Sequence, residues 1–160
     1  MINMAVAAPQ ITLPSFLHIE EIQANEELRL EIQNVASAWR DISREEIALC
    51  SDVNTRELYG RVERVNGAAI KKCRWVKKFL HKFSILICSG FDLEIKGFAF
   101  IKPITLGDRT FIHLNLLSTD PKNLFRESRI EKVGTFLIQS LFQKCRDEGF
   151  AGIYTHPSSK

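Results

Sequence analysis

The sequence predicts an α/β (α+β) domain in which helices flank a mixed central sheet. Three observations favour this class. Apolar residues recur at helical spacing through the first half of the chain, residues 83–119 form apolar runs separated by short turn signals, and residues 129–156 read as a helix followed by a strand. We therefore expect an antiparallel meander of three strands, followed by a right-handed strand–helix–strand crossover.

Bulk composition is typical of a globular protein. The chain has 160 residues, 45% apolar and 26% charged, which suits a single domain over residues 1–160, with residues 1–14 as a loose tail. A net charge of +3 does not by itself indicate nucleic acid, but it suits an anionic ligand. No apolar run approaches the roughly 20 residues that a bilayer requires, so we expect a soluble protein without a membrane segment.

The cysteines and the N-terminal sequence indicate in which cellular compartment the protein is expected. The four cysteines match neither a metal motif nor a CxxC pair, which predicts no metal and reduced, mostly buried thiols; they are Cys50, Cys73, Cys88 and Cys145. The N-terminus has no basic stretch typical of a secretory signal. Both observations predict a cytoplasmic protein.

The first half of the chain predicts one strand and two or three helices. Phe16–Ile22 alternates as a strand does, and residues 25–42 place apolar side chains on one helix face. Ser43, with Glu46 three residues later, has the pattern of a capping box that opens a new helix. Residues 55–82 remain helical in pattern, and Asn66-Gly67 is expected to divide them into two pieces.

The second half predicts four strands and one helix. The strands are FSILICS, LEIKGFAFIKPI, TFIHLNLLS and AGIYTH, and Gly149 is expected to end the helix that precedes the last of them. On the strand at residues 110–118, His113 and Asn115 are expected to share one face. Three apolar residues of that strand are expected on the opposite face: Ile112, Leu114 and Leu116.

Three stretches resemble the GNAT superfamily of N-acetyltransferases. ILICSGFDLEIKGFAFI is similar to the second and third strands of that superfamily, and LNLLSTDP to the end of its fourth strand, closed by Pro121. The run Arg129–Gly134 is similar to its acetyl-CoA loop, Q/R-x-x-G-x-G/A. The resemblance covers residues 16–156 and is specific from about Ser84 onward. It implies the acyl-CoA N-acyltransferase fold, with acetyl-CoA or another acyl-CoA as cosubstrate.

The loop has a physical rationale. The first N–H groups of a helix lack intrahelical partners and carry a partial positive charge, so a pyrophosphate can accept hydrogen bonds there. Arg129 can add a charge-assisted contact, and Lys132 stands where the first glycine of the motif belongs. The resemblance also implies that pantetheine bonds to the fourth strand. The expected cofactor-binding residues are Leu117, Ser118, Thr119, Arg129, Ile130, Glu131, Lys132, Val133, Gly134 and Thr135.

Two catalytic side chains are candidates, each with a plainer alternative. His113 can act as a general base, or it can be a histidine packed under the first helices. Tyr154 shares a strand face with His156 and can protonate the leaving thiolate, a role that a tyrosine of the fourth helix often has in the superfamily. Alternatively, Tyr154 is a packing residue.

The sequence departs from the superfamily at its end. GNAT enzymes continue with a fourth helix and two more strands, whereas this sequence stops shortly after the fifth strand. We therefore expect a C-terminally shortened GNAT-like domain. Three possibilities stay open: an active shortened enzyme, a site completed by another chain, or a protein that is not a full enzyme. The open edge of the last strand would also allow a homodimer.

These patterns leave three functions to distinguish. The favoured one is transfer of an acetyl group from acetyl-CoA to a primary amine of a small molecule or protein. The first alternative is a catalytically degenerate GNAT-fold binding or regulatory module. The second is a nucleic-acid-binding module that uses the basic run Lys71–Lys82, with Trp75 as a stacking surface. We favour reading that run as a solvated helix face with Trp75, Val76 and Leu80 buried.

Overall fold

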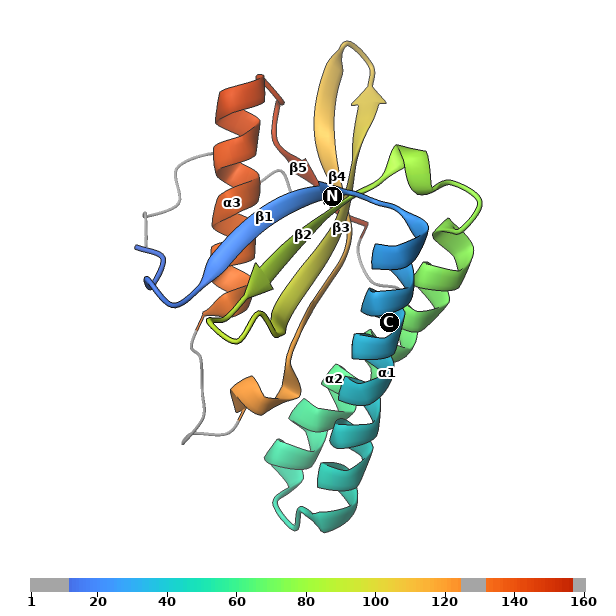
Figure 1. Ribbon diagram of the computed structural model, residues 1–160, viewed down its shortest axis with the longest axis vertical. Helices are drawn as coiled ribbons and strands as arrows, with labels where there is room; N and C mark the ends of the chain where they lie inside the picture. The colour runs from blue at the N-terminus through green and yellow to red at the C-terminus, as the bar shows by residue number, and fades with distance from the viewer. Residues whose placement is uncertain (1–11, 125–131, 157–160) are drawn as a thin grey trace.

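The computed structural model describes residues 12–124 and 132–156 and confirms the predicted α/β class. The strand–helix–helix–meander–helix–strand order also agrees with the prediction (Figure 1). The elements are β1 (His18–Gln23), α1 (Glu26–Leu49), α2 (Val53–Val76), η1 (Leu80–Lys82), β2 (Ser84–Ser89), β3 (Ile95–Leu106), β4 (Arg109–Thr119), η2 (Pro121–Leu124), α3 (Val133–Glu148) and β5 (Ile153–Tyr154).

One five-stranded sheet organises the molecule, in the order β1-β2-β3-β4-β5. Neighbouring strands are antiparallel from β1 to β4, and β5 pairs parallel to β4, so the predicted meander and crossover are confirmed. The α1–α2 hairpin lies on one face of the sheet and α3 on the other (Figure 1). In the part of the chain that the structure describes, no helix is long and apolar enough to span a membrane.

Two hydrophobic cores fill the spaces between these layers. Strand β3 supplies both, because successive side chains point to opposite faces. Phe98 and Phe100 pack under the α1–α2 hairpin, with Ile32 and Trp39 among their neighbours. On the α3 face the core includes Ala99, Ile101, Leu137, Leu141 and Ile153.

The helix boundaries confirm some local signals and correct two others. Asn25 caps α1, its side chain accepting a hydrogen bond from the Leu28 N–H at 2.8 Å, and Gly149 ends α3 in the left-handed conformation. The predicted capping box at Ser43 is wrong. Helix α1 runs through that position, and the buried Ser43 hydroxyl donates to the Trp39 carbonyl within the helix.

The predicted break at Asn66-Gly67 is also wrong, since α2 is continuous from Val53 to Val76. Asn66 is fully buried in mid-helix, and its amide donates to the Val62 carbonyl at 3.0 Å. Gly67 lies beside the Arg40 side chain of α1, which crosses closely at this point. Packing of α2 against α1 and the sheet therefore overrides the local turn signal.

A β-bulge interrupts β4 at Asn115. Leu114 pairs with Ile101 and Leu116 pairs with Phe100, which leaves Asn115 without a partner on β3. The bulge reverses the alternation of faces along the strand. Leu114 packs with the α3 core, whereas Leu116 packs with the α1–α2 core, so the expectation that Leu116 shares a face with Ile112 and Leu114 is wrong.

Candidate functional site

A gap opens between β4 and β5. Among the described residues, these strands pair only at Ile112–Ile153 and His113–Tyr154, although β4 continues to Thr119. In the described residues, the second half of β4 thus has no strand partner on this side. Its backbone N–H and C=O groups can pair with an extended ligand, as an added strand would.

Helix α3 begins beside the end of β4. Lys132 precedes the helix in a left-handed conformation, with φ at 72°, and its side chain is exposed. This conformation is one that glycine adopts more easily than lysine does. The first intrahelical bond runs from the Phe136 N–H to the Lys132 carbonyl, so the amides of residues 133–135 come before the helix ladder.

Gly134 has room for a larger side chain on the protein side. A Cβ atom built there would lie 3.7 Å from Leu117 Cδ2 and 3.8 Å from Thr119 Cγ2, which is ordinary contact. Packing therefore does not require glycine at this position. The structure brings Gly134 next to the predicted β4 residues Leu117 and Thr119, and Val133 and Thr135 flank it in the first turn of α3. Arg129, Ile130 and Glu131 lie outside the described residues.

Gly97 sets how closely α3 approaches the sheet. A Cβ atom at Gly97 would lie 2.7 Å from Val133 Cγ1 and 3.1 Å from Leu137 Cδ1. Such close distances are not tolerated without movement. The glycine of the GFAF stretch therefore allows the start of α3 to lie directly on β3.

Ser118 connects the end of β4 to α2. Its hydroxyl donates to the Asn66 side-chain oxygen at 2.8 Å, and both residues are buried. A pocket of about 130 Å³ lies next to this bond, lined by Val62, Val65 and Leu117–Thr119. Asn66 is a residue whose role sequence reasoning missed, because a lone asparagine before glycine reads as a turn signal.

A polar cluster occupies the α1–α2 face of the sheet where β4 and β5 meet. The His113 ring contacts those of Tyr154 and His156, with centroids 5.1 and 5.0 Å apart. The Tyr154 hydroxyl lies 3.3 Å from His156 Nδ1. Asn115 links the cluster to α2, its amide lying 3.3 Å from His113 Nδ1 while its oxygen accepts from Lys72 at 3.2 Å.

Burial and nearby cations keep His113 neutral. Only 6% of its surface is exposed. Burial is the main cause that lowers its pKa to about 4, and His156, Lys102 and Lys72 lower it further. At neutral pH the ring can accept a proton, but with such a low pKa it is a weak base.

This pKa predicts a loss of stability in acid. Between the ordinary value of 6.5 and about 4, the unfolded chain binds a proton that folded His113 does not. Stability should therefore be fully retained above pH 6.5 and fall as the pH decreases. From pH 7 to pH 5, wild type should lose about 2 kcal/mol more unfolding free energy than His113→Asn. Urea unfolding at both pH values measures this difference, and equal losses would contradict the prediction.

The basic run at the end of α2 differs from its expected arrangement. Val76 is buried, but Trp75 is 51% exposed, so the expectation that Trp75 is buried is wrong. Its ring packs against Phe79, with centroids 5.2 Å apart, and Lys72 Nζ lies 4.7 Å from its centre. Lys72 thus turns inward from a helix face whose other lysines are exposed.

The cysteines agree with their prediction. All four are free thiols, and three of them are buried. Burial raises the pKa of Cys73 and of Cys88 to about 11, so neither is a reactive thiolate. Among the residues described, no group of His, Cys, Asp and Glu side chains could hold a metal ion.

Solved structures share this fold. The chain matches an aminoglycoside acetyltransferase from an uncultured soil metagenomic sample, in complex with sisomicin, at a TM-score of 0.52 and 15% identity, covering 90% of this chain and 79% of that one. It matches the glucosamine N-acetyltransferase region of a fungal multi-domain β-N-acetylglucosaminidase at a TM-score of 0.55 and 14% identity. This match covers 95% of this chain and 15% of that one. A Vibrio cholerae integron cassette protein matches at a TM-score of 0.51 and 9% identity, covering 91% of this chain and 78% of that one. No family model and no curated protein matches the sequence.

These matches identify the class of structure. The chain has the fold of the GNAT superfamily of N-acetyltransferases, as the motifs from Ser84 onward predicted. At 9–15% identity the likeness concerns the fold. Its function must be argued from the site itself.

Proposed function

We propose that this protein is an acyl-CoA-dependent N-acetyltransferase that transfers an acetyl group from acetyl-CoA to a primary amine. The observation that carries the proposal is the position of the α3 N-terminus. Its first amides and Gly134 lie beside the unpaired half of β4, where Leu117 and Thr119 border the gap. One extended ligand with an anionic end could thus meet both groups of backbone donors.

The residues present fit acetyl-CoA. The helix amides of residues 133–135 suit a pyrophosphate, and Gly134 leaves its approach free of a side chain. The open edge of β4 at residues 117–119 suits the amide groups of pantetheine. Arg129, Ile130 and Glu131 would complete the phosphate contacts as the motif implies. When bound, acetyl-CoA supplies the thioester whose acetyl group is transferred.

The chain itself would position the amine and move protons. A backbone N–H of residues 117–119 would stabilise negative charge on the acetyl oxygen. Neutral His113 can accept a proton from the amine directly or through water, and the Tyr154 hydroxyl can donate one to the sulfur. These roles are modest, so much of the catalysis would come from alignment.

Three features of the location and assembly belong to the same proposal. We include a cytoplasmic location in the proposal, and the four free thiols support it. β5 is an edge strand, so a homodimer could pair along it. The amine acceptor would approach from the α1–α2 side of the sheet, where the polar cluster around His113 lies.

Calorimetric titration with acetyl-CoA tests the cofactor site. We expect wild type to bind with micromolar affinity and Gly134→Glu to show no binding, because a carboxylate would occupy the phosphate position. Gly134→Ala is the matched control for removing glycine. It should stay folded, since the structure has room for a Cβ atom, and should bind more weakly than wild type.

The calorimetric titration can also contradict the proposed function. No heat and no thermal shift of wild type at millimolar acetyl-CoA would overturn the enzyme proposal. It would favour the alternative of a GNAT-shaped binding or regulatory module. Equal binding by wild type and Gly134→Glu would instead show that the ligand binds away from the α3 N-terminus.

A further inference from the structure

In the part of the chain that the structure describes, the sheet face under α2 carries several cations that form no ion pair. Lys72 of α2, Lys82 of η1 and Lys102 of β3 line this side of the molecule. Within residues 12–124 and 132–156, none of the three forms an ion pair with a carboxylate. The polar cluster around His113 lies on the same face.

Lys72 is the most unusual of these cations. It is half-buried, and its side chain contacts two neutral groups, the Asn115 oxygen and the ring of Trp75. Burial lowers its pKa, and Lys102 lowers it further. A partly buried ammonium without a counter-ion costs stability, so an arriving anion would be favoured there.

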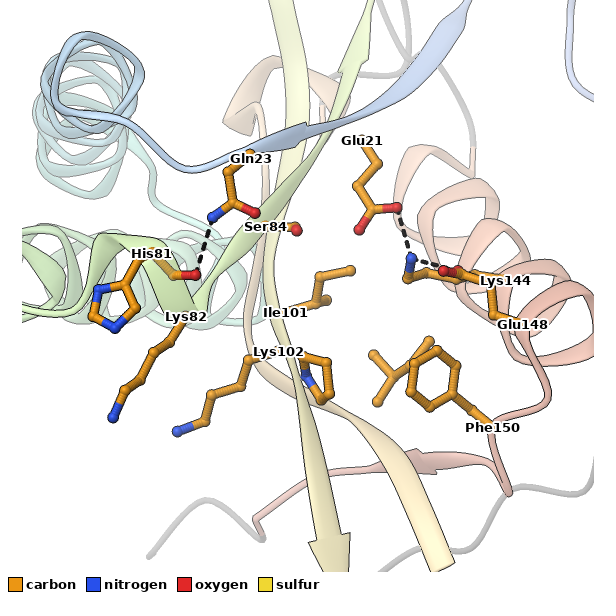
Figure 2. A pocket seen from close by; sticks show the side chains of 12 residues that line it. Glu21, Gln23, His81, Lys82, Ser84, Ile101, Lys102, Lys144, Glu148 and Phe150 are labelled. Carbon is orange, nitrogen blue, oxygen red and sulfur yellow. Dashed lines mark hydrogen bonds and ion pairs between the residues drawn. The ribbon is translucent and has the colours of Figure 1, made fainter.

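A pocket leads to the second cation. It measures about 260 Å³ and lies where β3 extends beyond the start of β2, which leaves Lys102 and Pro103 without β2 partners. Figure 2 shows Lys82 and Lys102 extending on the α2 side of β3, whereas Ile101 and Phe150 lie on the α3 side. The pocket thus has unpaired lysines on the α2 side of β3, and apolar residues together with ion-paired residues on the α3 side.

The acidic residues of this pocket do not neutralise the lysines. Glu21 and Glu148 lie across β3 from Lys82 and Lys102, and both pair with Lys144 (Figure 2). The two sides of β3 therefore differ in charge. An oxyanion would be attracted to the α2 side.

These cations are adjacent to the proposed site of acyl transfer. Lys102 is the β3 partner of His113, and Lys72 reaches His113 through Asn115. His113 in turn pairs with Tyr154 where the gap between β4 and β5 begins. A ligand anchored by both lysines would place its remaining groups next to this point.

We propose that the amine acceptor carries an oxyanion, a carboxylate or a phosphate, which Lys72 and Lys102 bind beside His113. The inference rests on the proposed acetyltransferase function and names the class of its acceptor. Two charge-assisted contacts would hold the anion and orient the amine toward the gap.

The first test measures anion binding without any catalysis. The ring signals of His113 are followed by NMR during titration with inorganic phosphate and with acetate, at constant ionic strength. Groups facing His113 are Asn115, Tyr154, His156, Lys72 and Lys102. A bound anion should shift the signals saturably and raise the pKa of His113 by roughly 1 unit.

Lysine variants test which side chains bind the anion. Lys72→Gln and Lys102→Gln should each weaken anion binding by roughly tenfold. Lys71→Gln removes the same charge from an exposed neighbouring position and should bind as wild type does. No response of His113 to either anion, or the same weakening in Lys71→Gln as in Lys72→Gln, would overturn the proposal.

The second test compares acceptors of matched size in an acetyl-CoA assay. The pairs are γ-aminobutyrate with butylamine, and phosphoethanolamine with ethanolamine, which separate carboxylate from phosphate. Wild type should favour an anionic member by roughly tenfold or more in kcat/KM, and Lys72→Gln should lose that preference. If acetyl-CoA binds but the neutral amines react equally well, only this inference fails. If acetyl-CoA does not bind, the proposed function fails, and the NMR titration still reports on the anion site.

Discussion

Phe98→Ala should lower the free energy of unfolding by about 3–5 kcal/mol. Phe98 is fully buried between the sheet and the α1–α2 hairpin. Its ring stacks on Trp39 at a centroid distance of 5.6 Å and meets Phe100 edge-on at 6.1 Å. Truncation removes both contacts and leaves a cavity that neighbouring strands are too rigid to close.

Phe91→Ala provides the control for this experiment. The same chemical change occurs at a position that is 83% exposed, so the effect should stay within about 0.5 kcal/mol. Urea unfolding followed by tryptophan fluorescence measures both variants. If Phe98→Ala does not fold, Phe98→Leu gives a smaller, measurable loss. Similar stabilities for Phe98→Ala and Phe91→Ala would contradict the described core.

Gly97→Ala should destabilise the protein by about 1–3 kcal/mol and weaken acetyl-CoA binding. The new Cβ atom would overlap Val133 Cγ1 at 2.7 Å and press on Leu137. Val133 is buried and β-branched, so it has little freedom to move aside. Relief requires α3 to shift away from β3, which would displace the helix amides from the end of β4.

A double-mutant cycle isolates this contact. Val133→Ala alone should cost about 2 kcal/mol, because it removes two buried methyl groups. Combined with Gly97→Ala it also removes the overlapping atom, so the double variant should be at least about 1 kcal/mol more stable than the sum of the single effects. Acetyl-CoA affinity should recover in parallel. Strict additivity would indicate that α3 does not press on Gly97.

The spacing of apolar residues in the sequence was sufficient to predict most of the helices and strands. The apolar run in LEIKGFAFIKPI predicted a strand, and apolar spacing from Leu28 to Trp39 predicted a helix with one buried side. Such signals are local, because each depends on side-chain directions within one element. The strand–helix–strand order near the end of the sequence then predicted the parallel pairing of β4 with β5.

Local signals failed where a distant segment provides the partner. Ser43 reads as a cap, but packing of α1 on α2 keeps the helix intact and leaves the hydroxyl bonded within it. Asn66 reads as a break, but Ser118, 52 residues away, donates to its buried side chain. Neither the packing of α1 on α2 nor the contact of Asn66 with Ser118 can be found from spacing along the chain.

The sequence by itself determined the α/β class, the order of elements, and the proximity of Gly134 to the start of a helix. Only the tertiary structure decided that Asn115 forms a bulge, that Lys72 turns toward His113, and that Gly97 allows α3 to contact the sheet. The physical reason is the range of the interactions. Secondary structure follows from repeating patterns among near neighbours, whereas burial, charge and close approach depend on which surfaces meet after folding.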